Sequence, residues 1–149
     1  MKKILFILSF FVSFQLFSSQ KFLPSPYNTI TNVLPKLDHG WFLNAKSIEK
    51  LFAENEISTV IELGSWLGKS TIFMAQRLHD NGKIYAVDHW KGSLEYSETQ
   101  ERKTFLPTLY EQFLSNVIHA KQTNKIIPIK QSTYDAFFTL DVKADLIYI

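Results

Sequence analysis

The length, composition and charge of the chain limit what kind of protein it can be. Its 149 residues, of which 46% are hydrophobic, suffice for one domain with a core and argue against two. The absence of cysteine excludes disulfides, thiolate nucleophiles and cysteine-bound metals. The net charge of +2 falls to zero when Lys2 and Lys3 are left out, so no basic surface typical of nucleic-acid binding is expected.

Residues 1–19 resemble a secretory signal peptide or a short membrane anchor. Lys2 and Lys3 precede an apolar run from Ile4 to Phe17 that only a few polar residues interrupt. This run is shorter than the roughly 20 apolar residues that a membrane-spanning helix needs. We expect the protein to be secreted, periplasmic or membrane-anchored if the segment is a signal, and cytoplasmic otherwise. No other part of the chain is expected to contact a membrane.

Residues 20–43 are predicted to form an extended lead-in. Pro24, Pro26 and Pro35 disfavour regular structure there. The folded domain is predicted to cover residues 44–149. It begins with a helix that Asn44 can cap and that ends near Asn55, with an apolar stripe at helical spacing.

The rest of the chain alternates between the two hydrophobic periods that distinguish strands from helices. A polar, irregular stretch, residues 89–103, interrupts this alternation. Strands are predicted at 58–64, 83–88, 125–130 and 144–149, and helices at 68–80, 106–118 and 134–140. This order predicts an α/β, Rossmann-like parallel sheet with helices on both faces and strand order 3-2-1-4. Ligands bind such sheets beyond the carboxyl ends of the strands.

Two strand ends carry the residue types that a nucleoside ligand requires. The first strand leads into Glu62-Leu-Gly64-Ser-Trp-Leu-Gly68, an acid followed by a loop framed by glycines. Glycine permits a positive φ and a close approach of ligand to backbone. Asp88 ends the next strand, twenty residues beyond Gly68, where a carboxylate can accept hydrogen bonds from both ribose hydroxyls.

These segments together resemble the cofactor-binding half of the class I S-adenosylmethionine-dependent methyltransferases. The segments VIELGSWLGKSTI, IYAVDHWKGS, LYEQFLSNV and ADLIYI stand in family order, and the resemblance covers Ser47 to Ile149. It implies S-adenosylmethionine as cofactor and an unidentified methyl acceptor as second substrate. It also implies roles for the candidate residues: Glu62, Gly64 and Gly68 along the methionine moiety, Asp88 on the ribose, His89 and Trp90 as walls of the adenine site, and Gln131 and Ser132 at the adenine edge. Ser65, in the same glycine-framed loop, is a further cofactor-binding candidate.

The chemistry of the cofactor agrees with these roles. Its sulfonium and ammonium groups would be attracted by a carboxylate at Glu62 in a partly dry site, whereas a polyphosphate would be repelled. The sulfonium is already activated, so the protein acts mainly by aligning the acceptor with the methyl group. We assign no metal-binding residues.

Structural interpretations of the same residues remain open. The glycines can serve only a sharp turn, and Glu62 can pair with a lysine nearby. Asp88 can cap a turn, His89 and Trp90 can be packing residues, and Ser132 can cap the following helix.

Two other nucleotide-binding loops are weighed against this hypothesis. The segment from Gly64 to Ser70 is one residue shorter than the phosphate loop G-x-x-x-x-G-K-S. A nicotinamide-binding loop needs G-x-G-x-x-G, and the third place from Gly64 holds no glycine. The missing residue and the acid at Glu62 disfavour the phosphate loop, and the missing glycine disfavours the nicotinamide loop.

The predicted sheet has fewer strands than this family usually contains. In the family, the strand that matches ADLIYI is commonly followed by an acidic residue, glycine and histidine. The given sequence ends at Ile149, so these residues are not part of it. If the chain is a fragment of a longer enzyme, methyl transfer is expected. If it ends at Ile149, we expect a non-catalytic or truncated domain that binds a nucleoside ligand, and self-association through an exposed last strand.

Overall fold

The computed structural model describes residues 23–92 and 106–149. The predicted signal or anchor segment, residues 1–19, and most of the polar stretch 89–103 lie outside the described residues. The elements in chain order are η1 (Tyr27–Thr29), α2 (Ala45–Glu54), β1 (Thr59–Leu63), α3 (Lys69–Ala75), β2 (Lys83–Asp88), η3 (Leu106–Thr108), α5 (Leu109–His119), β3 (Ile126–Lys130), α6 (Thr133–Thr139) and β4 (Leu146–Tyr148).

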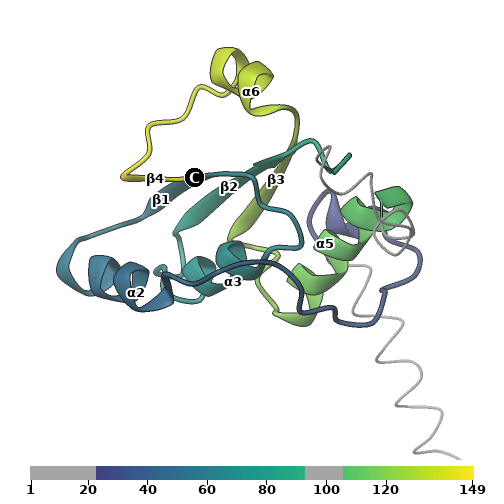
Figure 1. Ribbon diagram of the computed structural model, residues 1–149, viewed down its shortest axis with the longest axis horizontal. Coiled ribbons are helices and arrows are strands. Elements are labelled where there is room, and N and C mark those ends of the chain that lie inside the picture. The colour runs from purple at the N-terminus through teal and green to yellow at the C-terminus, as the bar shows by residue number, and fades with distance from the viewer. Residues whose placement is uncertain (1–22, 93–105) are drawn as a thin grey trace, which may run out of the picture.

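The described strands form a four-stranded parallel sheet in the order β3-β2-β1-β4 (Figure 1). The α/β class and the strand order predicted from the sequence are confirmed. In this register Glu62 lies opposite Ala86, and Asp88 lies opposite Lys130. The carboxyl ends of β1 and β2 therefore meet at one edge of the sheet, which is where the two candidate binding segments begin.

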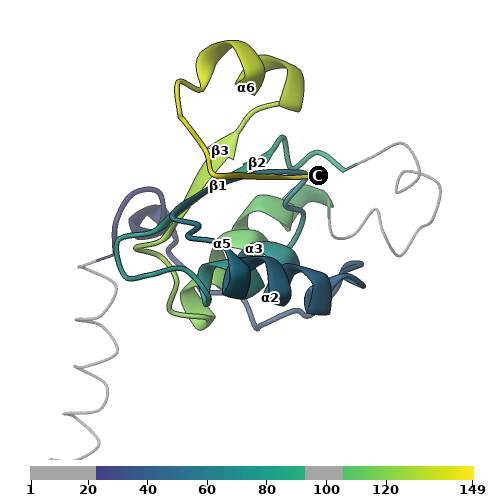
Figure 2. The same ribbon diagram turned by 90° about the vertical axis from the view of Figure 1, so that its left-hand side faces the viewer.

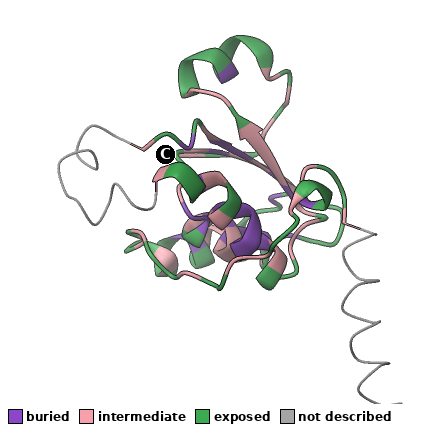
Figure 3. Ribbon diagram, turned by 90° about the vertical axis from the view of Figure 1, so that its right-hand side faces the viewer, coloured by how far each residue is buried: buried purple, intermediate pink, exposed green. Residues whose placement is uncertain are grey.

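Helices cover both faces of the sheet, but unequally. Helices α2, α3 and α5 lie on one face, and among the described residues α6 is the helix on the other (Figure 2). The buried residues gather between the sheet and the first three helices, whereas α6 is mostly exposed (Figure 3). Val60, Met74, Ile84, Phe113 and Val117 are fully buried in this layer. The core thus forms on the face that three helices cover.

The lead-in segment packs onto this core. Tyr27 is buried, and its hydroxyl donates a hydrogen bond to the Ile126 carbonyl at 2.9 Å. Further along, residues 34–37 lie against α5 and bond to its polar side chains. Burial raises the pKa of Tyr27, so the phenol stays protonated and donates this bond at physiological pH. The segment that precedes the sheet is part of the domain's packing.

Two local predictions differ from the structure. The helix predicted to reach Asp80 ends at Ala75, because the amides of Arg77 and Leu78 both bond to the Met74 carbonyl and turn the chain toward β2. Asn44 precedes α2 but makes no side-chain capping bond. Its side-chain oxygen instead accepts a hydrogen bond from the Tyr148 hydroxyl at 3.0 Å, which links the start of α2 to β4.

Candidate functional site

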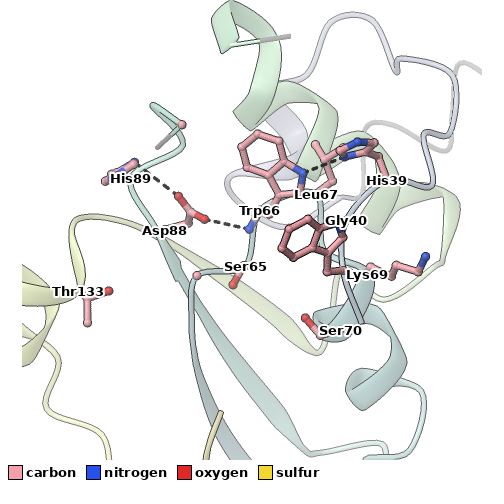
Figure 4. A pocket seen from close by; sticks show the side chains of 13 residues that line it. His39, Gly40, Ser65, Trp66, Leu67, Lys69, Ser70, Asp88, His89 and Thr133 are labelled. Carbon is pink, nitrogen blue, oxygen red and sulfur yellow. Dashed lines mark hydrogen bonds and ion pairs between the residues drawn. The ribbon is translucent and has the colours of Figure 1, made fainter. Parts of the chain in front are cut away.

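A cavity of about 320 Å³ lies at the carboxyl ends of β1 and β2 (Figure 4). The loop after β1 and the end of β2 form much of its lining. The lead-in segment adds His39, Gly40 and Trp41, and the start of α6 adds Thr133. Its position is the one that parallel α/β sheets use for ligands.

The backbone of the loop between β1 and α3 is shaped by its two glycines. Gly64 has φ +91° and Gly68 has φ +84°, in the left-handed region that favours glycine. A Cβ added at Gly64 would meet no described atom within 4 Å, whereas one added at Gly68 would lie 3.1 Å from the Phe113 ring. Gly64 therefore leaves open space at the cavity, and Gly68 permits close packing against α5.

Glu62 lies beneath this loop and does not line the cavity. It is fully buried, and its carboxylate accepts hydrogen bonds from the hydroxyls of Ser65 at 2.7 Å, Ser70 at 2.5 Å and Thr71. Burial raises the pKa of Glu62 despite these three bonds, and the nearby Asp88 raises it further. We expected Glu62 to attract a cationic ligand by direct contact. This expectation is corrected, because the side chain is buried and does not line the cavity. The three hydroxyls hold this carboxylate below the surface, where it ties the loop to the first turn of α3.

Asp88 is the carboxylate that faces the cavity. Its Oδ2 accepts a hydrogen bond from the Trp66 amide at 2.9 Å, and its Oδ1 accepts one from the Trp90 amide at 2.7 Å. The His89 ring nitrogen lies 3.6 Å from Oδ1. Each carboxylate oxygen has a second lone pair, so Asp88 can still accept from two hydroxyls of a vicinal diol. The two amides fix the orientation in which it would do so.

The remaining predicted residues fall into two groups. Gly64, Ser65, Asp88 and His89 line the cavity together. Glu62, Gly68, Trp90, Gln131 and Ser132 are not among its lining residues.

Trp90 is a packing residue in this structure. Its side chain is 4% exposed and packs against the rings of Tyr110 and Phe113, at centroid distances of 4.7 and 4.8 Å. Its indole N–H donates to the Trp66 carbonyl at 2.7 Å. Trp90 therefore stabilises the loop through the Trp66 carbonyl, and the adjacent His89, not Trp90, lines the cavity.

Gln131 and Ser132 bond to α6. The Ser132 hydroxyl accepts from the Asp135 amide at 3.0 Å and donates to the Asp135 carboxylate at 2.6 Å, a reciprocal arrangement at the N-terminus of the helix. Gln131 Oε1 accepts from the Thr139 hydroxyl at 2.8 Å. The cavity is reached from this segment by Thr133 instead.

Sequence reasoning missed two contributions to the site. The first is the pair of hydroxyls of Ser70 and Thr71, which bond to Glu62. Two hydroxyl residues in the first turn of a helix, shortly after an acid in a buried strand, could have indicated these bonds. The wall formed by His39, Gly40 and Trp41 had no such signal. Its position depends on contacts with α5, which is more than seventy residues away in sequence.

The loop is poorly suited to bind phosphate. The amides of Gly64, Trp66 and Gly68 already donate to the Val87 carbonyl, the Asp88 carboxylate and the Ser65 carbonyl. A phosphate loop needs such amides free to converge on an anion. Lys69, at the place of the phosphate-binding lysine, pairs with Asp38 at 3.2 Å.

Neither a metal site nor a membrane helix is found in residues 23–92 and 106–149. They contain no group of three or more histidine, aspartate or glutamate side chains that could hold a metal ion. No helix in the same ranges is long and apolar enough to cross a membrane.

Comparison with known proteins decides the family. A family model described as a methyltransferase domain matches residues 61–149, more than half of the chain. The chain belongs to the class I S-adenosylmethionine-dependent methyltransferases. The matched residues of this methyltransferase domain contain the glycine-framed loop, Asp88 and the last strand, so the resemblance predicted from these segments is confirmed. No curated protein sequence matches the chain.

Three solved structures of similar fold are described as O-methyltransferases. A putative O-methyltransferase from Klebsiella pneumoniae superposes with a TM-score of 0.56 at 17% identity, covering 76% of this chain and 46% of that one. The O-methyltransferase TomG from Streptomyces achromogenes, solved with S-adenosylmethionine, gives 0.55 at 14% identity, covering 91% and 58%. An O-methyltransferase from Bacillus cereus, solved with S-adenosylhomocysteine, gives 0.50 at 17%, covering 90% and 50%. The methyltransferase domain described here thus spans about half the length of these proteins.

Proposed function

We propose that this methyltransferase domain binds S-adenosylmethionine in the cavity at the ends of β1 and β2 and supports transfer of its methyl group to an acceptor. One observation carries the proposal: Asp88 faces the cavity beside Gly64, and two backbone amides hold its carboxylate in place. Two structures of similar fold were solved with S-adenosylmethionine or S-adenosylhomocysteine. Membership of the family supports the choice of ligand.

The residues of the chain would hold the cofactor by its two ends. Asp88 would accept hydrogen bonds from the ribose hydroxyls, with His89 on the adenosine side. The open space at Gly64 would admit the methionine moiety next to the backbone, with the Ser65 and Ser70 side chains nearby. The sulfonium supplies an activated methyl group. What the protein adds is orientation and exclusion of water, which raise the rate without a general base unless the acceptor must lose a proton.

Ligand-induced stabilisation distinguishes this function from the two nucleotide alternatives. We expect S-adenosylhomocysteine to stabilise the protein by about 2.7 kcal/mol at one hundred times its dissociation constant. ATP and NAD⁺ at equal concentration are expected to leave the unfolding temperature unchanged, because the amides of Gly64, Trp66 and Gly68 are already hydrogen-bonded and Glu62 lies beneath the loop. Stabilisation by ATP without any by S-adenosylhomocysteine would contradict the proposal.

Turnover distinguishes a catalytic domain from one that only binds. The domain spans about half the length of similar structures, so binding without transfer is the second candidate function. Incubation with methyl-labelled S-adenosylmethionine and a panel of hydroxyl-bearing acceptors measures transfer directly. Label in an acceptor supports the enzyme, and binding with no transfer to any acceptor supports the second candidate.

A further inference from the structure

The lead-in residues 34–41, which we call the strap, form one wall of the cavity. The strap crosses α5 and reaches the cavity with His39, Gly40 and Trp41. His39 accepts a hydrogen bond from the Trp66 indole at 3.4 Å, and Figure 4 shows His39 and Gly40 beside Trp66, with Asp88 on its other side. The strap and the loop after β1 are therefore neighbouring walls of one cavity, although they belong to different parts of the chain.

A row of polar side chains on α5 holds the strap by its backbone. They are Gln112, Ser115, Asn116 and His119, spaced so that they share one face of the helix. Ser115 Oγ accepts a hydrogen bond from the Leu34 amide at 3.0 Å, and His119 Nε2 bonds to the Leu34 carbonyl at 2.8 Å. Gln112 Nε2 donates to the Pro35 carbonyl at 2.9 Å, and the Asn116 side chain makes two hydrogen bonds to the Leu37 backbone. An extended segment thus has hydrogen-bond partners without belonging to a sheet.

Asn116 differs from the other three because it also bonds to the cofactor loop. Its side chain is 3% exposed. Oδ1 accepts from the Leu37 amide at 3.0 Å, and Nδ2 donates to the carbonyls of Leu37 and Leu67, both at 2.9 Å. Leu67 lies between Gly64 and Gly68. One buried amide group therefore connects the strap, two residues before His39, with the loop that carries Ser65 and Trp66.

Apolar packing holds the strap only in part at this point, through Leu37, which is half-buried against the core. A second cavity of about 240 Å³ lies under it, lined by Leu37, Phe42, Phe73, Gln76 and Asn116 among others. The ion pair between Asp38 and Lys69 is largely exposed and is worth little by itself. Asn116 provides the buried polar link between strap and loop, since the hydrogen bond between His39 and the Trp66 indole is exposed.

We propose that Asn116 is a positioning residue of the cofactor site, which sets the strap wall against the loop wall so that the cavity fits its ligand. This inference rests on the proposed function. A buried, fully bonded amide holds a single geometry, because any shift leaves a backbone polar group unpaired away from water. Asn116 does not itself line the cavity, so its loss would change the cavity only through the strap and through Leu67, to which it bonds.

Asn116→Asp tests the proposal with little change of side-chain size. Aspartate keeps an acceptor for the Leu37 amide and loses both donors, to Leu37 and to Leu67. We expect S-adenosylhomocysteine to bind at least about tenfold more weakly by calorimetry. Ser115→Ala is the matched control: Ser115 is equally buried on the same helix and bonds the strap at Leu34, without a bond to the loop. Its dissociation constant is expected to stay within about twofold.

The outcomes separate the inference from the function on which it rests. Failure of the unmodified full chain to bind S-adenosylhomocysteine overturns both. Binding that Asn116→Asp leaves unchanged, or that Ser115→Ala weakens as strongly, overturns the positioning role alone. If Asn116→Asp does not fold, hydrogen exchange of the Leu37 amide in the unmodified protein decides. The ligand is expected to slow this exchange several-fold, and an unchanged rate contradicts the proposal.

Discussion

Glu62 and Asp88 end neighbouring strands, yet their surroundings give them different tasks. Asp88 accepts two backbone amides and faces the cavity, so it can still bind hydroxyls. Glu62 is enclosed by three hydroxyls and is fully buried. The first carboxylate is placed to contact a ligand, and the second is placed to fix the loop on which the ligand would rest.

The raised pKa of Glu62 predicts how stability depends on pH. Above the ordinary value of 4.5 the unfolded chain releases this proton first, while the folded state retains it until its own higher pKa. The free energy of unfolding should therefore fall as the pH rises through that interval. Glu62→Gln removes this dependence, and its amide can still bond to hydroxyls. Urea unfolding at a series of values from about pH 5 to about pH 8 measures the free energy of unfolding of both proteins above the ordinary glutamate pKa. The same dependence of this free energy on pH in both proteins would contradict the burial of a titrating Glu62.

The sequence was enough to predict Asp88 at the site but not to place Glu62. A carboxylate at the end of a strand reaches the ligand edge by topology alone, and the strand period predicts that position. Whether the side chain then faces the cavity or turns beneath the loop depends on Ser65, Ser70 and Thr71, whose rotamers leave no periodic signal. For the same reason the burial of Trp90 against α5 stayed one of two open interpretations.

At the scale of elements, the strands and helices form where hydrophobic periodicity predicts them. Their ends depend on contacts that periodicity does not contain. Helix α3 ends five residues early, at Ala75, because two amides share the Met74 carbonyl. Asn44 precedes α2 as expected but bonds to Tyr148, since β4 brings that hydroxyl within reach. Long-range partners thus replace the local cap that the sequence indicates.

The start of α6 provides a prediction for Ser132. Its hydroxyl caps the helix through Asp135, so Ser132→Ala is expected to cost about 1 kcal/mol of local stability. Because α6 is short and mostly exposed, hydrogen exchange of the helix amides is the suitable measurement. The affinity for S-adenosylhomocysteine should change less than about twofold. A tenfold or larger loss would instead support the contact with the adenine edge that the family resemblance implies.

At the scale of the whole molecule, one face of the sheet is thinly covered. Helix α6 is the described helix on that face (Figure 2). Large apolar side chains are exposed there: Tyr134, Phe137 and Phe138 on α6, Ile147 on β4, and Ile149 just after β4. Exposed apolar patches of this kind are typical of surfaces that contact another protein, a membrane, a ligand or another copy of the same chain. In the similar structures, the chain corresponds to about half of the protein.

This face predicts that the 149-residue chain self-associates when it is produced alone. Sedimentation velocity over a range of concentrations should show species larger than the monomer. Ile147 is 59% exposed on β4, and Ile147→Lys should shift the distribution toward monomer because a charge opposes apolar contact on a strand. Lys46→Glu, a charge change on α2 at the other face, is the control. A monomer at all concentrations would refute the prediction.

The sequence contains the least information about how distant segments pack against one another. Alternating periods predicted the sheet and its order, because right-handed crossovers leave few topologies. The strap has neither period nor motif, and its place at the cavity follows from hydrogen bonds to α5. A contribution of this kind becomes visible only when segments far apart in sequence are brought together.

The central claim, that the cavity beside Asp88 binds the methyl donor, is tested most directly by calorimetry with S-adenosylhomocysteine on a pair of variants. Asp88 and Asp145 each accept two backbone amides, but Asp145 does so at the opposite end of the sheet, from Ser58 and Thr59. Asp88→Ala is expected to weaken binding about 10- to 100-fold, since hydrogen bonds to a charged group are lost. Asp145→Ala should bind as the unmodified protein does. Equal affinity of the two variants for the ligand would contradict the account.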